Sequence, residues 1–193
     1  ARVPVRAAYD GHTRELYVTY ADAPGPNGQS TGSVHKLRTT DGRWTDVTPV
    51  VPGATTDDGS ADTFGYGGVA VDARRPGTVV VSTNNRWAAV DTLFRTTDGG
   101  RTWTSLKDSA VLDVSETPYL AWGADKPKFG WWIQAVALDP FDSRHIVYGT
   151  GATLYGTRDL RHWAPQIRGL EETAIRLLIS PPTGEAHLIS GCG

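Results

Sequence analysis

The sequence has little of several residue types that would point to a function. Its 193 residues include one cysteine, Cys192, and no methionine. A single cysteine excludes an internal disulfide, and no group of metal-ligating residues surrounds it. The five histidines are scattered and lack the spacing of a metal site. We therefore expect neither a metal ion nor any other cofactor.

A strong charge of either sign and a long apolar run are also missing. The formal net charge is −2, which gives no reason to expect a nucleic acid or an anionic membrane as a partner. No apolar run approaches the length of about 18 residues that a membrane-spanning helix needs. Helical periodicity is absent over any useful length, so the sequence favours an all-β protein.

What the sequence does contain is a tryptophan that recurs behind a turn motif. Trp44, Trp103 and Trp163 are separated by 59 and 60 residues. The middle copy, residues 96–103, fits S/T-x-D-x-G-x-T-W, the Asp-box, and the two outer copies are shortened versions of it. A fixed period of this size indicates one supersecondary unit repeated along the chain.

Each of these motifs predicts the turn of a β-hairpin. Glycine accepts a positive φ, and the aspartate carboxylate accepts backbone N–H bonds within its own turn. We therefore interpret Asp41, Asp98 and Asp159 as structural residues and not as catalytic ones. The tryptophan begins the following strand, and we expect its indole to pack back over the turn.

Short β-branched runs complete a four-stranded unit around each motif. Residues 68–72 and 78–83 are joined by a turn, and residues 135–139 and 146–150 repeat that hairpin pattern. Four antiparallel strands in a repeated unit are typical of a β-propeller blade. We predict about three and a half blades, over residues 7–44, 68–106 and 135–167, with the start of a fourth over 173–190. Because such an array leaves open sheet edges, we expect the chain to be a piece of a longer protein.

Three long connections separate the predicted strands, at residues 23–32, 53–65 and 107–130. The longest, residues 107–130, is predicted to be a loop between two blades. Long loops in a compact repeat protein often carry function.

Aromatic residues gather where these loops lead into the predicted innermost strands. Indole and phenol rings can stack on sugar C–H surfaces, while amides and guanidinium groups bind sugar hydroxyls. The alternative is that many of these rings pack between blades, since tryptophan is mostly buried. The predicted substrate-binding residues are Tyr66, Arg86, Trp87, Tyr119, Trp122, Trp131, Trp132 and Gln134.

A pair of carboxylates, which glycoside hydrolysis normally requires, does not stand out. Asp72 and Asp139 lie in turn motifs, and Asp91 lies in a loop. The adjacent Glu171 and Glu172 would point to opposite faces of a strand. We therefore assign no catalytic residue.

The later part of the chain resembles a known family. Residues 131–143, WWIQAVALDPFDS, resemble the inner-strand segment of glycoside hydrolase family 74, the xyloglucanases. Residues 148–155, 169–174 and 179–193 are similar to that family as well, and the resemblance runs over nearly the whole chain. It is more specific than the Asp-box, which also occurs in sialidases and sortilin-like receptors.

This resemblance implies tandem seven-bladed propellers with an open cleft, and inverting, metal-free, endo-type hydrolysis of the β-1,4-glucan backbone of xyloglucan. It implies that residues 1–168 are later blades of a first propeller and that residues 169–193 cross to the next blade or a second propeller. The family's base-bearing segment matches no part of this chain, and its acid follows a segment like residues 190–193. We therefore expect the chain to lack both catalytic aspartates.

The same resemblance implies an extracellular parent enzyme, and the scarcity of lysine beside arginine favours a bacterial source. The implied partners are xyloglucan or a related β-glucan, together with the remaining portions of the parent propellers. One alternative is a non-catalytic Asp-box propeller that binds a glycan or a protein. A sialidase-type enzyme is a weaker alternative, because no arginine cluster with a tyrosine nucleophile can be identified.

Overall fold

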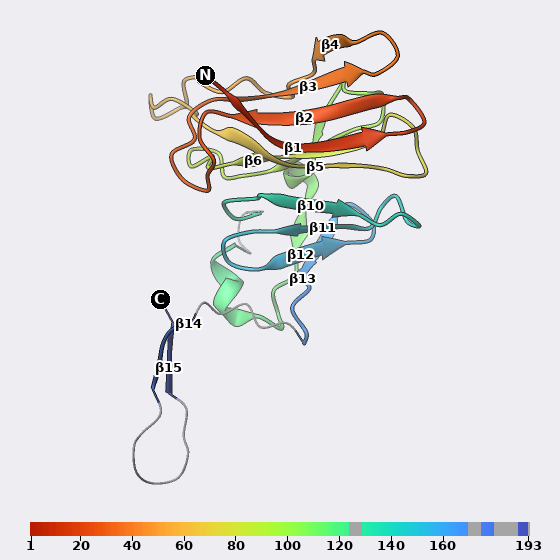
Figure 1. Cartoon of the computed structure of the whole chain (residues 1–193). Coiled ribbons are helices and arrows are strands. Elements are labelled where there is room, and N and C mark those ends of the chain that lie inside the picture. Colours follow the sequence, from red (N-terminus) through yellow and green to blue (C-terminus); the bar gives the residue numbers. More distant parts are fainter. Residues whose placement is uncertain (124–128, 170–174, 180–188, 193) are drawn as a thin grey trace.

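The computed structural model describes residues 1–123, 129–169, 175–179 and 189–192. Three sheets follow one another along the chain, and in each of them four consecutive strands pair antiparallel in sequence order. Figure 1 shows the first sheet in red and orange and the third in teal and blue. These sheets confirm the predicted blades, although the described part of the chain does not close into a ring.

The first sheet consists of β1 (Val3–Asp10), β2 (Glu15–Ala21), β3 (Gly32–Arg38) and β4 (Arg43–Asp46). The second consists of β5 (Gly65–Val71), β6 (Val79–Asn84), β7 (Leu93–Thr96) and β8 (Thr104–Ser105). The third contains β10 (Ala135–Leu138), β11 (Ile146–Gly149), β12 (Leu154–Thr157) and β13 (His162–Pro165). The strands β1, β5 and β10 begin their sheets, and β5 contacts both β1 and β10. They are therefore the inner strands of neighbouring blades.

The long connection after the second sheet is more than a loop, contrary to the prediction. It contains the 3₁₀ helices η1 (Lys107–Ser109) and η2 (Pro118–Gly123), and the strand β9 (Val111–Leu112). β9 pairs parallel with β13 and adds a fifth strand to the third sheet. A two-residue strand is too short to show periodicity, and its partner lies far along the chain, so the sequence pattern could not reveal it.

A separate antiparallel pair, β14 (Ile175–Ile179) and β15 (Ile189–Cys192), follows the third sheet. The first of these strands agrees with the strand predicted at residues 174–180. The second was predicted at residues 186–190; its described part extends past Ser190, and the predicted start lies outside the described residues.

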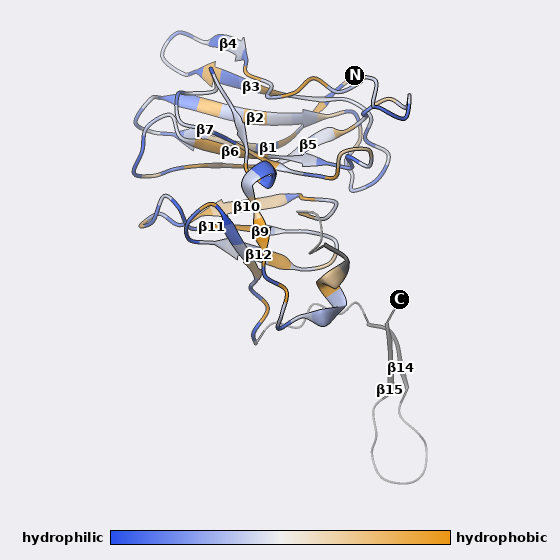
Figure 2. Cartoon of the chain, turned by 180° about the vertical axis from the view of Figure 1, so that it is seen from behind, coloured by the Kyte–Doolittle hydropathy of each residue, from blue (hydrophilic) through white to orange (hydrophobic). Residues whose placement is uncertain are grey.

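The hydrophobic core lies between the sheets. Val79 and Val81 of β6 pack with Tyr17 of the first sheet, whereas Val80 packs with Ile146 of the third. Alternate residues of a strand point to opposite faces, so β6 is apolar on both sides. Figure 2 shows β6 and parts of the third sheet in the orange of hydrophobic residues. The second blade is thus held from both sides by burial of apolar surface.

The aspartates of the three turn motifs hold their own turns, as predicted. Asp98 accepts hydrogen bonds from the backbone N–H of Arg101 and Thr102 and from the hydroxyls of Thr96 and Thr102. Asp159 and Asp41 accept backbone N–H bonds in the same way, from residues 161 and 162 and from residue 43. The hydrogen bonds from Thr102 and Thr96 hold the pKa of Asp98 well below its usual range.

The tryptophans behind these turns lie in three different environments. The indole N–H of Trp103 donates to the carbonyl of Val47 in the preceding blade, at 2.9 Å. Trp163 is fully buried against Phe129 and Tyr148. Trp44, in the first sheet, is 50% exposed. The three motif tryptophans therefore differ: Trp103 bonds to the preceding unit, Trp163 packs on Tyr148 of its own sheet, and Trp44 is half-exposed.

Candidate binding site

Three of the six predicted aromatic residues come from two short segments. Residues 85–87 directly follow β6 of the second blade, and residues 131–132 lead into β10 of the third blade. β6 runs antiparallel to β5, and β10 packs against both of these strands. The end of β6 and the approach to β10 therefore meet at the same edge of the two blades.

Three tryptophans form a cluster at this edge, which we call the tryptophan platform: Trp87, Trp131 and Trp132. The rings of Trp87 and Trp131 stack with centroids 5.4 Å apart and planes inclined by 26°. Trp132 meets Trp87 edge-on, with centroids 5.9 Å apart. Trp87 is 54% exposed, whereas the other two are half-buried. The platform thus presents aromatic surface to solvent on a base of packed rings.

Hydrogen bonds fix the orientation of two of these indoles. The indole N–H of Trp87 donates to Oδ1 of Asn85 at 2.8 Å, and that of Trp132 donates to Oδ1 of Asn27 at 3.0 Å. Asn27 belongs to the connection between β2 and β3, so a third loop supports the platform. One face of the Trp87 ring is covered by Trp131, and the side chain as a whole is 54% exposed.

The backbone around the platform is strained. Asn85, Val90 and Trp132 have φ values of 66°, 63° and 63°, in the left-handed region that favours glycine. Asparagine tolerates this region, but a β-branched or bulky residue there costs on the order of 1–3 kcal/mol. Such strain persists only where the surrounding structure imposes it, and it is often found at functional sites.

A buried carboxylate lies among these strained residues. Asp91 is 0% exposed, and it accepts hydrogen bonds from the backbone N–H groups of Asn85, Arg86 and Trp132 and from the hydroxyl of Thr83. Burial raises the pKa of Asp91, and these four donors oppose that effect by stabilising the carboxylate. From the sequence Asp91 is an ordinary loop residue, because its donors come from two different blades.

Arg86 contacts the loop that precedes β5. Its guanidinium group makes a two-nitrogen ion pair with Asp62, with Nη2 2.6 Å from Oδ2, and lies over the ring of Phe64 at 4.6 Å. Both members of the ion pair are largely buried. Arg86 therefore ties the platform segment to the loop before β5, and its donors to Asp62 are not available to a sugar.

The other predicted residues lie in different environments. Tyr66 is completely buried; its hydroxyl donates to the carbonyl of Val50 and accepts from the N–H of the same residue. Gln134 is half-buried, with its amide against Gly25. Tyr119 lies on η2 and is 61% exposed. The side chain of Trp122 lies outside the described residues.

Known proteins resemble this chain over most of its length. No family model matches it. A xyloglucanase from Paenibacillus sp. is 41% identical over 92% of the chain. The oligoxyloglucan-reducing end-specific xyloglucanase of Emericella nidulans is 34% identical over the same share. The crystal structure of the GH74 xyloglucanase from Xanthomonas campestris matches 100% of the chain with a TM-score of 0.82 at 35% identity.

The chain belongs to glycoside hydrolase family 74. It corresponds to only part of these relatives, spanning 19% of the Paenibacillus enzyme and 27% of each of the other two. In this family 74 chain, the two segments of the tryptophan platform belong to neighbouring blades.

A group of hydrogen-bonded amide side chains beside the platform, Gln29, Asn84 and Asn85, could not be recognised from the sequence. Asn84 donates to Oε1 of Gln29 at 2.7 Å, and Asn85 donates to the backbone carbonyl of Gln29 at 2.8 Å. Gln29 and Asn84 are almost completely buried. The pair Asn84–Asn85 stands out in the sequence at the end of a strand, but nothing there indicates that Gln29 is its partner.

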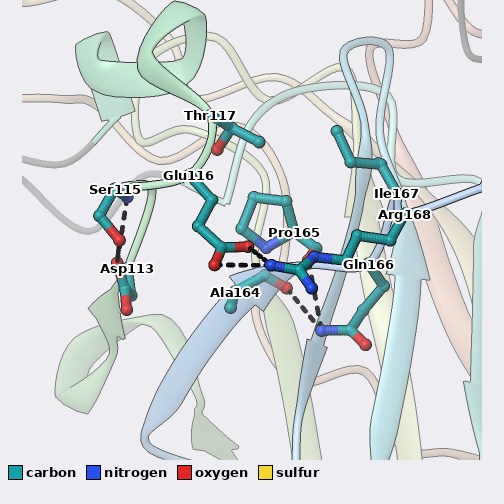
Figure 3. A pocket seen from close by; sticks show the side chains of 9 residues that line it. All are labelled: Asp113, Ser115, Glu116, Thr117, Ala164, Pro165, Gln166, Ile167 and Arg168. Carbon is teal, nitrogen blue, oxygen red and sulfur yellow. Dashed lines mark hydrogen bonds and ion pairs between the residues drawn. The ribbon is translucent and has the colours of Figure 1, made fainter.

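A hollow of about 750 Å³ lies elsewhere, between the loop after β9 and the end of β13 (Figure 3). Its two carboxylates are both engaged: Asp113 accepts from Ser115, and Glu116 pairs with Arg168 at 2.8 Å. Its lining contains no aromatic side chain. The hollow therefore offers neither a stacking surface nor a free carboxylate pair.

Neither a membrane-spanning helix nor a metal site is found among the described residues. No helix among them is long and apolar enough to cross a membrane. No group of three or more histidine, cysteine, aspartate or glutamate side chains in the same ranges is placed to hold a metal ion.

Proposed function

We propose that this chain forms part of the substrate-binding wall of a secreted, xyloglucan-hydrolysing, inverting endo-β-1,4-glucanase. The observation that carries the proposal is the tryptophan platform at the edge of two adjoining blades, with its solvent-facing Trp87 ring. An aromatic ring of this kind stacks on the C–H face of a glucose unit. The xyloglucanases among the relatives support xyloglucan as the polysaccharide.

The substrate contacts in this proposal are the platform tryptophans, with Gln134 and Tyr119 as further contacts. Tyr66 and Arg86 are left out, because the first is fully buried and the second is held by Asp62. We expect the chain alone to bind the polysaccharide without hydrolysing it. Asp72, Asp91 and Asp139 each accept hydrogen bonds from their own surroundings.

The direct test is calorimetric titration of the purified chain with xyloglucan, with reducing-sugar release followed in parallel. We expect binding without release. Trp87→Ala should weaken the affinity roughly fivefold, which corresponds to about 1 kcal/mol for one stacking contact. Trp44→Ala is the matched control: Trp44 is 50% exposed but lies on a different sheet, so this substitution should leave the affinity for xyloglucan unchanged. Equal affinities of the wild type and Trp87→Ala would refute the proposal, and measurable hydrolysis would refute the expected lack of a catalytic pair.

We further propose that the partners of this chain include the remaining blades of the parent propellers, and that residues 169–193 lead into the next blade or propeller. A row of apolar side chains across the first sheet supports the proposed preceding blade. In this row Tyr9 pairs with Leu16, Leu16 with Leu37, and Leu37 with Trp44. Tyr9 and Trp44 are each 50% exposed. On the second sheet, the face that corresponds to this row is buried against the first sheet. The exposed apolar row on the first sheet would therefore suit a preceding blade that covers it in the same way.

A further inference from the structure

One carboxylate connects the two segments that carry the tryptophan platform. Oδ1 of Asp91 accepts hydrogen bonds from the hydroxyl of Thr83 at 3.0 Å and from the N–H of Arg86 at 2.9 Å. Oδ2 accepts from the N–H of Asn85 at 3.1 Å and from the N–H of Trp132 at 2.7 Å. Asp91 therefore joins the end of β6 in one blade to the approach to β10 in the next.

This carboxylate cannot touch a polysaccharide, because Asp91 is 0% exposed. Its effect must pass through the backbone that it holds. Two of its donors, Asn85 and Trp132, have positive φ, and so does Val90, which precedes it in the chain. Left-handed backbone at valine and tryptophan requires an external restraint. The hydrogen bond from Trp132 to Asp91 supplies that restraint at one of the tryptophans, and the bonds from Asn85 and Arg86 hold the backbone directly before Trp87.

We infer that Asp91 is a positioning residue for polysaccharide binding: it holds Trp87, Trp131 and Trp132 in their packed arrangement across the two blades. The consequence for affinity rests on the proposed function, whereas the consequence for tryptophan geometry does not. Both oxygens are needed, since a carboxylate can only accept. In an amide of the same shape, an NH₂ group would face backbone N–H donors on one side and lose their hydrogen bonds.

The test is Asp91→Asn in the full 193-residue chain, compared with Asp72→Asn. Asp72 is a suitable control because it is 1% exposed and accepts the backbone N–H groups of Arg74 and Arg75, but it follows the opposite end of β5. Two properties are measured. The first is the exciton circular-dichroism signal of the stacked Trp87–Trp131 pair without ligand, assigned through its loss in Trp87→Phe. The second is the affinity for xyloglucan.

We expect Asp91→Asn to lose most of the exciton signal and to bind xyloglucan about tenfold more weakly, as expected for the loss of one or two hydrogen bonds. Asp72→Asn should keep both properties, even if it unfolds at a lower temperature. An unchanged exciton signal in folded Asp91→Asn would overturn the inference. Equal loss of the signal in both variants would also overturn it, since it would indicate general destabilisation.

If Asp91→Asn does not fold, Thr83→Val removes a single donor to the same carboxylate. We expect a smaller reduction of both properties, and an unchanged exciton signal in that variant would count against the inference. If the wild-type chain does not bind xyloglucan, the proposed function fails, while the exciton signal still decides the role of Asp91.

Discussion

The indole N–H of Trp103 donates a 2.9 Å hydrogen bond to the backbone carbonyl of Val47 in the preceding blade. The tryptophan of the turn motif thus connects two repeats. Trp44 occupies the same position of the first repeat, where it is half-exposed. Two residues at one position of the motif therefore differ in environment, and their substitution should differ in effect.

Trp103→Phe should lower the free energy of unfolding by about 1–2 kcal/mol, because it removes this hydrogen bond and part of the buried ring. Trp44→Phe should change it by less than about 0.5 kcal/mol, as is usual for a surface substitution. Urea denaturation of both variants measures the difference. Equal losses would show that the motif tryptophan acts within its own turn.

Arg86→Met should destabilise the chain by about 2–4 kcal/mol, because it leaves the largely buried Asp62 without its cation. Arg144→Met is the control: Arg144 is 63% exposed and 3.8 Å from Asp142, so its loss should cost about 0–0.5 kcal/mol. Thermal denaturation compares the two. The double variant Asp62→Leu/Arg86→Met should recover part of the loss, and no recovery would contradict this account.

Gly151→Ala should disturb the tryptophan platform directly. A Cβ at this position would lie 2.3 Å from Cε3 of Trp132, so the indole would have to move. We expect a changed near-ultraviolet circular-dichroism spectrum and destabilisation by about 1–3 kcal/mol, as for overpacking. At Gly149 a Cβ meets only the flexible end of Leu154, at 3.3 Å. Gly149→Ala should therefore leave the spectrum nearly unchanged, and a similar change in both variants would argue against a specific contact.

Stability should depend on pH through Asp98. The hydrogen bonds from Thr102 and Thr96 lower its pKa in the folded chain below the unfolded value of about 3.9. The stabilisation is therefore fully present above about pH 4 and is lost as the pH falls through the folded pKa. Asp98→Asn should lower the melting temperature at pH 7, and the difference from the wild type should shrink in acid.

The matched comparison for this prediction is Trp103→Phe, whose hydrogen bond to Val47 involves no titrating group. Its effect on the melting temperature should stay constant over the same pH range. A constant effect of Asp98→Asn would show that the carboxylate charge does not stabilise the turn.

Much of the fold could be predicted because it is local and repeated. The turns at Asp98 and Asp159 depend on residues within a few positions of one another, and the strands show their period directly. The short strand β9 could not be predicted, since its partner β13 lies about fifty residues later in the chain and two residues carry no pattern.

The binding site was predictable only as a set of candidates. The sequence by itself determined that aromatic residues lead into the inner strands of a repeated all-β unit. Only the tertiary structure decided that Trp87 faces solvent, that Tyr66 is buried, and that Arg86 is held by Asp62. It also decided that Asp91 joins two blades. The physical reason is distance along the chain: local turns form from neighbouring residues, whereas exposure and the partners of a buried carboxylate are set by packing between blades.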